Sequence, residues 1–220
     1  MGLTPASRVV SRSAGFTLIE LLVVIGILAL LSGVLYASLG RGNQAAERFA
    51  DQANLRWHYQ VFTDYHTSHG HKLPPGTGHR FVLEPWVSRS VQRTPENFER
   101  YWTPGLPSTR REALELLDME TVWNDRSALD SDDTQYAGPS AELKQQRLFG
   151  NDQLPLMAND NEHGPAFLDH TINVLMGGGQ VRTLVLDPNL IEEGFDPSVA
   201  GATFPVGAGS PHEVLSRLEK

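Results

Sequence analysis

The feature that most constrains this chain is an apolar run near its N-terminus that contains a single carboxylate. Phe16 to Leu39 is a stretch of 24 residues in which Glu20 is the only charged side chain. As an α-helix this run is roughly 36 Å long, which is enough to cross the hydrocarbon core of a bilayer. A charge in such a segment is costly and usually marks a function with a partner group. We therefore predict that residues 16–39 form a transmembrane helix and that Glu20 is its functional residue.

The residues at the start of this run form a specific motif. Gly15-Phe16-Thr17-Leu18-Ile19-Glu20, followed by the apolar stretch, resembles the N-terminus of type IV prepilins and type II secretion pseudopilins. The resemblance implies that a prepilin peptidase cuts after Gly15 and that the new N-terminal residue, Phe16, is N-methylated. It also implies that Glu20 acts in assembly. The electrostatics agree, since pairing Glu20 with the Phe16 amine of a neighbouring subunit would offset the desolvation of both groups.

The residues before the motif predict the orientation in the membrane. Residues 1–15 carry Arg8 and Arg12 and no acid, so they form a basic leader that stays in the cytoplasm under the positive-inside rule. The remainder would then lie in the periplasm, attached to the bacterial inner membrane by a single pass. Two alternatives are an ordinary signal peptide cleaved near Ser38-Leu39-Gly40 and a plain membrane anchor.

Composition restricts what the part after the span does. Residues 41–220 hold 16 basic and 25 acidic residues, a net charge of −9, and contain no basic run. This argues against a nucleic-acid partner. The chain has no cysteine, which excludes disulfides, thiol catalysis and cysteine-based zinc sites.

The sequence patterns divide the chain into four segments and predict an α+β fold. After the leader (1–15) and the transmembrane half of a long spine helix (16–39), residues 40–70 form the amphipathic half of that helix. Residues 71–220 form a head domain with a small antiparallel sheet and short helices. The apolar face of the amphipathic half is predicted from i+4 steps: Phe49, Ala53, Trp57, Val61 and Tyr65. The alternative is two helices hinged at Gly40-Arg41-Gly42.

Several short elements are predicted in the head. Residues 70–78 form a loop, and residues 81–91 form a strand interrupted by Pro85. Residues 124–139 are predicted as a polar loop. Helices are predicted from capping and apolar patterns in three places: 109–120, with a capping box at Thr109 and Glu112, then 140–149 and 210–218.

The clearest strand signal is a hairpin. Two β-rich runs, 171–176 and 180–186, flank the turn Gly177-Gly178-Gly179. The run 173–181 also resembles, in degraded form, the C-terminal His-x9-Asp-Gly signature of a group of bacterial prepilin-like proteins. Leu168, Gly178 and Gln180 occupy the positions of its polar residues.

Metal binding has only weak sequence support. Asp130, Asp132 and Asp133 offer oxygen ligands for calcium, but their spacing is not that of an EF-hand, and a solvated acidic loop is the default. His66 and His69 are spaced to share a helix face, against the alternative of solvated histidines at a helix end. No cofactor is expected.

We interpret the chain as a prepilin-like structural subunit and not an enzyme. It would be processed by prepilin peptidase and assembled into a type IV pilus-like or type II secretion pseudopilus filament. Its partners would be other pilin subunits, the inner membrane, and the assembly platform with its ATPase machinery. The alternative is a membrane-tethered binding or hydrolytic domain that uses a pilin-like anchor.

Overall fold

The structure, a computed structural model, describes residues 18–159, 171–185, 206–208, 210 and 212–219, without the side chains of residues 33–41. The chain divides into two units, residues 1–43 and residues 44–220. The predicted leader and cleavage position lie outside the described residues.

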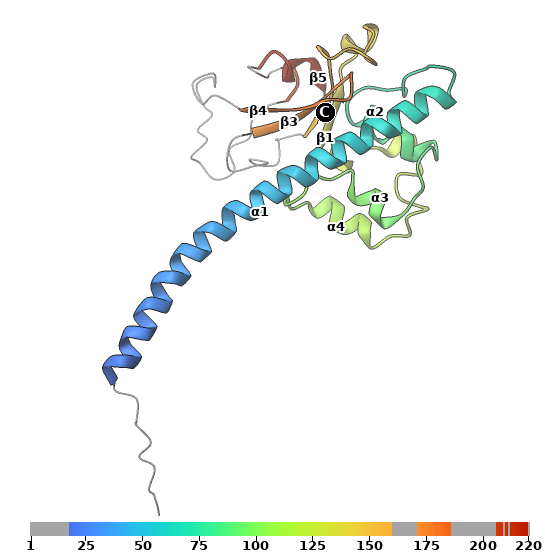
Figure 1. The fold of residues 1–220 in the computed structure, drawn as a ribbon. Helices are drawn as coiled ribbons and strands as arrows, with labels where there is room; N and C mark the ends of the chain where they lie inside the picture. Colours follow the sequence, from blue (N-terminus) through green and yellow to red (C-terminus); the bar gives the residue numbers. More distant parts are fainter. Residues whose placement is uncertain (1–17, 160–170, 186–205, 209, 211, 220) are drawn as a thin grey trace, which may run out of the picture. The chain divides into compact units, whose positions relative to one another are not determined.

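One helix belongs to both units. Helix α1 (Leu18–Ser68) has 51 residues and passes through Gly40 and Gly42 without interruption (Figure 1). No proline lies within it, so no residue of the helix lacks the backbone N–H that donates to the preceding turn. The helix ends at Ser68, two residues before the predicted end of the spine helix, and residues 40–42 are helical.

Among the described residues, no helix combines the length and the apolarity that crossing a membrane requires. The transmembrane half predicted for residues 16–39 is therefore not shown.

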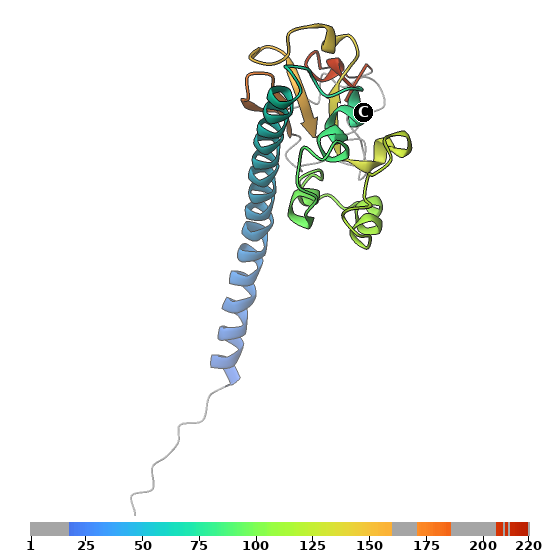
Figure 2. The same ribbon diagram turned by 90° about the vertical axis from the view of Figure 1, so that its right-hand side faces the viewer.

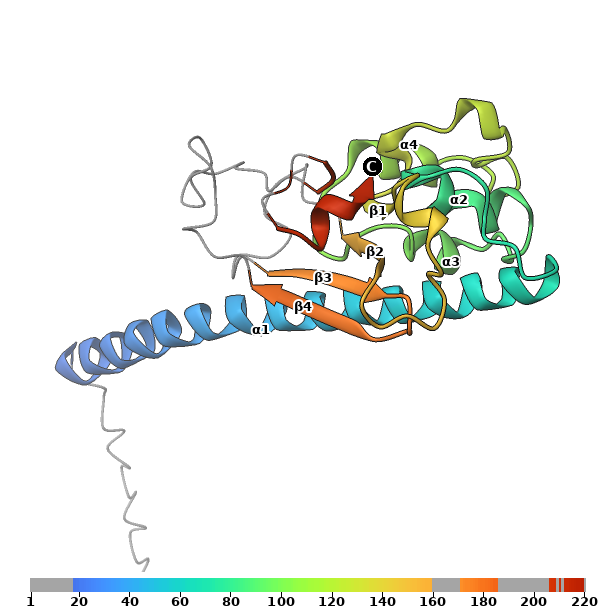
Figure 3. The same ribbon diagram turned by 90° about the horizontal axis from the view of Figure 1, so that it is seen from above.

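The second unit contains an antiparallel sheet of five strands, which confirms the α+β class. Its strands lie in the order β4-β3-β2-β1-β5 (Figures 1 and 3). Their bounds are β1 Tyr136–Pro139, β2 Pro155–Asn159, β3 Thr171–Met176, β4 Val181–Val185 and β5 Leu218–Glu219. The predicted hairpin is β3 and β4, paired so that Asn173 is opposite Thr183.

Residues 44–68 of α1 lie along β3 and β4, as Figures 2 and 3 show. The hairpin turn reaches the helix at Gly179, whose φ is +89° and whose missing Cβ would stand 2.7 Å from the ring of Tyr59. Glycine satisfies both demands, a left-handed backbone and a close approach. The glycine turn is thus shaped by its contact with α1.

The strand predicted for residues 81–91 is wrong. Residues Gly78–Val87 form helix α2, with Pro85 in its last turn. A short apolar run fits a strand or a buried helix equally well, and here Phe81, Val82 and Trp86 are buried as a helix face. Pro85 removes one bond near the helix end, where the helix stops two residues later.

Two predicted helices are shorter than expected. Helix α4 is Thr109–Glu115, with Ser108 and not Thr109 as its N-cap, and it ends before Leu116, which is 87% exposed. Of residues 140–149, Leu143–Gln145 form a single 3₁₀ turn, η3.

The two remaining differences share one cause. The predicted loop 124–139 contains 3₁₀ turns η1 (Arg126–Ala128) and η2 (Ser131–Asp133) and ends in β1. At the C-terminus, a 3₁₀ turn η5 (Leu215–Arg217) leads into β5, which pairs with β1. Strand β1 pairs with β2 as well as with β5, and both pairings join segments that are not adjacent in the sequence. Local patterns do not report such pairing.

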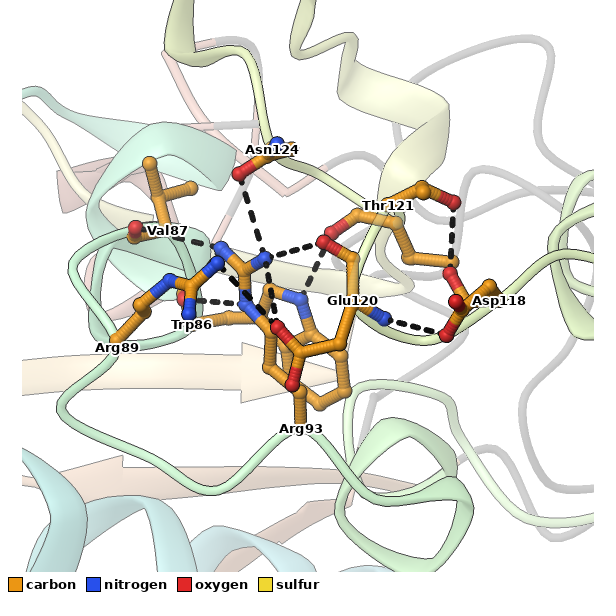
Figure 4. A network of polar contacts seen from close by, with 9 residues as sticks. Trp86, Val87, Arg89, Arg93, Asp118, Glu120, Thr121 and Asn124 are labelled. Carbon is orange, nitrogen blue, oxygen red and sulfur yellow. Dashed lines mark hydrogen bonds and ion pairs between the residues drawn. The ribbon is translucent and has the colours of Figure 1, made fainter.

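The loops beside α2 and α3 (Pro95–Glu99) are fixed by an aromatic cluster and one arginine. Trp86 donates from Nε1 to the carbonyl oxygen of Val122 at 2.9 Å. The buried Arg93 guanidinium donates to the carbonyl oxygens of Trp86 and Val87 at 3.4–3.5 Å and to that of Glu120 at 2.6 Å (Figure 4). Arg93 thereby donates to carbonyl groups at the C-terminal end of α2, where the helix dipole favours a cation.

Candidate functional site

Glu20 is the predicted functional residue that the structure describes. It lies in the first turn of α1, where the helix dipole favours a carboxylate. Gly15 and Phe16, the predicted cleavage and methylation residues, are outside the described residues.

The side chains around Glu20 form an unusual surface for a helix. Consecutive apolar residues are exposed on all its sides, from 81% for Leu18 and 71% for Ile19 to 57% for Leu31. A helix that is apolar all round is normally enclosed by protein or lipid. The first unit therefore presents a surface suited to burial, with one carboxylate near its start.

The second unit contains a buried polar core that sequence reasoning missed. Asp51 of α1 is fully buried, and its carboxylate accepts a hydrogen bond from Tyr136 Oη and another from Asn173 Nδ2, both at 2.7 Å. Thr183 donates to Asn173 Oδ1 at 2.7 Å and accepts from Gln52 at 3.1 Å. These bonds join the helix to β1, β3 and β4.

Burial changes the ionisation of two groups in this core. Burial raises the pKa of Asp51 to about 6, against the opposing effect of its bonds from Tyr136 and Asn173. Burial lowers the pKa of His58 to about 3. His58 Nε2 lies 2.9 Å from the carbonyl oxygen of Arg100, and since that oxygen only accepts, Nε2 carries the proton of a neutral imidazole. His58 is therefore part of the core and not a pH-sensing surface group.

The polar core also corrects the predicted face of the helix. The buried positions follow helical spacing: Asp51, Leu55, His58, Phe62 and Tyr65. Of the predicted apolar face, Val61 and Tyr65 are buried and Trp57 is partly buried, whereas Phe49 is 62% exposed and Ala53 is exposed. The signal was present in the spacing of Leu55, Phe62 and Tyr65, but two polar residues on the same stripe concealed it.

The acidic residues considered for calcium are arranged for other contacts. Asp133 is buried, and its Oδ1 accepts from Arg110 Nε and lies 2.7 Å from Arg110 Nη2. Its Oδ2 accepts from the backbone N–H of Asp130 at 2.9 Å. Across the part of the chain that the structure describes, no three His, Cys, Asp or Glu residues are placed to hold a metal ion.

One groove in the second unit has features that a binding site would need. It has a volume of about 330 Å³ and lies between α1 and the segment around α3 and α4. Burial, together with a hydrogen bond to Glu115, raises the pKa of Glu99 in this groove to about 7. Its lining residues are Ala50, Ala53, Asn54, Glu96, Glu99, Arg100, Trp102, Pro104 and Arg111, a set with no hydroxyl, thiol or imidazole nucleophile.

Comparison with known proteins identifies the N-terminal segment. Residues 10–36 match the family profile of the prokaryotic N-terminal methylation motif, the signal of type IV prepilins and pseudopilins. The chain thus carries the motif of a type IV pilin-like or pseudopilin precursor, which implies processing by prepilin peptidase and association with pilin subunits in general. No curated protein and no solved structure matches the chain.

Proposed function

We propose that this protein is a structural subunit of a type IV pilus-like or type II secretion pseudopilus filament, cleaved after Gly15 and N-methylated at Phe16. The observation that carries the proposal is the methylation motif at residues 10–36, whose residues 18–36 lie in α1. The subunit would act by assembly and not by catalysis.

The exposed apolar surface at the start of α1 supports this role. Leu18 to Leu31 would be held in the inner membrane before assembly and packed against neighbouring helices afterwards. Both environments cover apolar side chains, so the transfer between them changes little in hydration. The assembly platform and its ATPase would drive that transfer.

The buried polar core supports the proposal that the head is attached rigidly to that helix. Asp51, Tyr136 and Asn173 fix residues 44–68 of α1 to the sheet through short hydrogen bonds. A subunit in a filament needs such a fixed connection, since loads on the head pass to the helix through it. The head would face the periplasm or the exterior of the filament.

Mass spectrometry of the mature N-terminus tests the proposal. We expect a chain beginning with N-methylated Phe16, and an uncut precursor when Gly15 is replaced by a bulky residue. A mature chain beginning at residues 38–41 would overturn the proposal in favour of a signal peptide.

A further inference from the structure

The end of α1 brings two histidines together that lie five positions apart in the sequence. After the helix ends at Ser68, Gly70 (φ 66°) and His71 (φ 61°) both adopt left-handed conformations. The backbone N–H of His71 donates to the carbonyl oxygen of His66 at 2.8 Å. The chain is thereby turned back so that the His71 ring meets the His66 ring, with centroids 5.0 Å apart.

The distance between the two rings is informative. The Nδ1 atoms of His66 and His71 are 3.5 Å apart. This exceeds the usual length of an N–H hydrogen bond, about 2.7–3.2 Å. Two imidazole nitrogens bound to one tetrahedral metal ion at about 2.0–2.1 Å stand about 3.3 Å apart. The observed contact is a long hydrogen bond between the two rings, and its length is also close to the separation that a shared metal ion requires.

The surroundings favour a cation at this point. The pair sits at the C-terminal end of a 51-residue helix, where the carbonyl groups carry partial negative charge. The His66 ring packs beside Phe149, with centroids 5.1 Å apart, which restricts its rotation. His71 is held in a conformation that a residue with a side chain rarely adopts, and such strain is often found at functional sites.

We propose that His66 and His71 bind one divalent transition-metal ion, of the zinc and copper class, through their Nδ1 atoms. Imidazole is a preferred ligand of both ions. Since no third side-chain ligand joins the pair among the described residues, water completes the coordination. The ion would pin the turn 69–71 to the end of α1, and the site does not depend on filament assembly.

His69 provides a matched control within the same turn. It is exposed and close in sequence to both ligands, but its ring stacks on Tyr65 at 3.9 Å and its Nδ1 lies 3.0 Å from the carbonyl oxygen of Tyr65. The earlier prediction that His66 and His69 form a pair is therefore replaced by the pair His66 and His71.

Calorimetric titration with Zn²⁺ tests the site on the full chain in detergent micelles, purified with a tag that lacks histidine. We expect one ion per chain, and weakening by about 10–100-fold in His66→Gln and in His71→Gln, since loss of even an outer-shell partner has that effect. His69→Gln should bind like the wild type. In parallel, electron paramagnetic resonance spectra of bound Cu²⁺ should show hyperfine coupling to two imidazole nitrogens in the wild type and to one in either ligand variant.

Three outcomes would overturn the assignment. These are the absence of saturable binding to the wild type, unchanged binding in both ligand variants, and an equal loss in His69→Gln. Because His71 lies beyond the helix, His71→Gln keeps the test valid even if His66→Gln perturbs the end of α1.

Discussion

The two halves of α1 differ in which side chains they expose and which they bury. In residues 18–32 nearly every side chain is apolar and exposed, and Glu20 is the one charge. In residues 44–68 the buried stripe includes Asp51 and His58, each fully enclosed. In the second half, Tyr136 and Asn173 of the sheet donate to Asp51, and the carbonyl oxygen of Arg100 accepts from His58. One helix thus combines an exposed apolar surface with a structural support.

The difference shows how a carboxylate can serve two purposes. Asp51 is enclosed by donors from its own chain, Tyr136 and Asn173, so its role is to fix the helix on the sheet. We expect Glu20 to find its counter-charge on another subunit, so its role is to fix one chain on the next. Substitutions in the two halves should therefore separate assembly from folding.

The largest expected effect is that of Glu20→Ala on assembly. Removing one partner of a buried charge pair costs about 3–5 kcal/mol, so filament recovered by shearing should fall by about a hundredfold or more. Glu20→Gln should be intermediate, because it accepts hydrogen bonds without a charge. Peptidase cleavage, membrane insertion and folding of the head should persist in both. Assembly of Glu20→Ala at the wild-type level would remove Glu20 from the mechanism.

The second effect concerns the pH dependence set by Asp51. Its pKa is about 6 in the folded chain against 3.8 unfolded, so the folded state holds more protons between these values. Its contribution to stability therefore falls as the pH rises from about 4 to 6. As the pH rises from 4 to 7, the free energy of unfolding of Asp51→Asn should increase by about 2–3 kcal/mol relative to that of the wild type. Urea unfolding in detergent measures this change.

His58 gives the opposite sign and serves as the control for that experiment. Its pKa is about 3 in the folded chain against 6.5 unfolded, so the unfolded state holds more protons in this window and its contribution rises with pH. His58→Gln should lose stability relative to wild type as the pH rises from 3 to 6.5. Parallel curves for both variants and the wild type would contradict the burial of these groups.

The third effect is that of Gly177→Ala in the head. A Cβ there would overlap the backbone carbonyl of Leu148, and Gly177 is held by bonds of 2.8 Å to Leu154 and Gly150. We expect a loss of about 1–3 kcal/mol in the free energy of unfolding. Gly42→Ala, in the helix with open space around it, should instead stabilise by about 0.5–1 kcal/mol. Equal effects at the two glycines would argue against the packing at the hairpin.

The smallest effect is expected at Leu116, the residue after the last residue of α4. Because this side chain is 87% exposed, Leu116→Ala should change the free energy of unfolding by less than about 0.5 kcal/mol. Replacing the buried neighbour Leu114 by alanine should lower the free energy of unfolding by about 2–3 kcal/mol. Thermal unfolding of the two variants side by side measures the difference. A large loss at Leu116 would mean that helix α4 extends as first predicted.

The sequence alone determined the features that depend on neighbouring residues. The motif at Gly15–Glu20, the long helix and the β3–β4 hairpin all follow from local spacing and turn chemistry. The tertiary structure decided what depends on distant partners. Contacts between segments far apart in the sequence decide helix α2 in place of a strand, strands β1 and β5, and the buried Asp51. The meeting of His66 with His71 depends on the left-handed backbone at Gly70 and His71. The physical reason is that a polar residue can be buried when other parts of the chain supply its hydrogen-bond partners, and those partners are far away in the sequence.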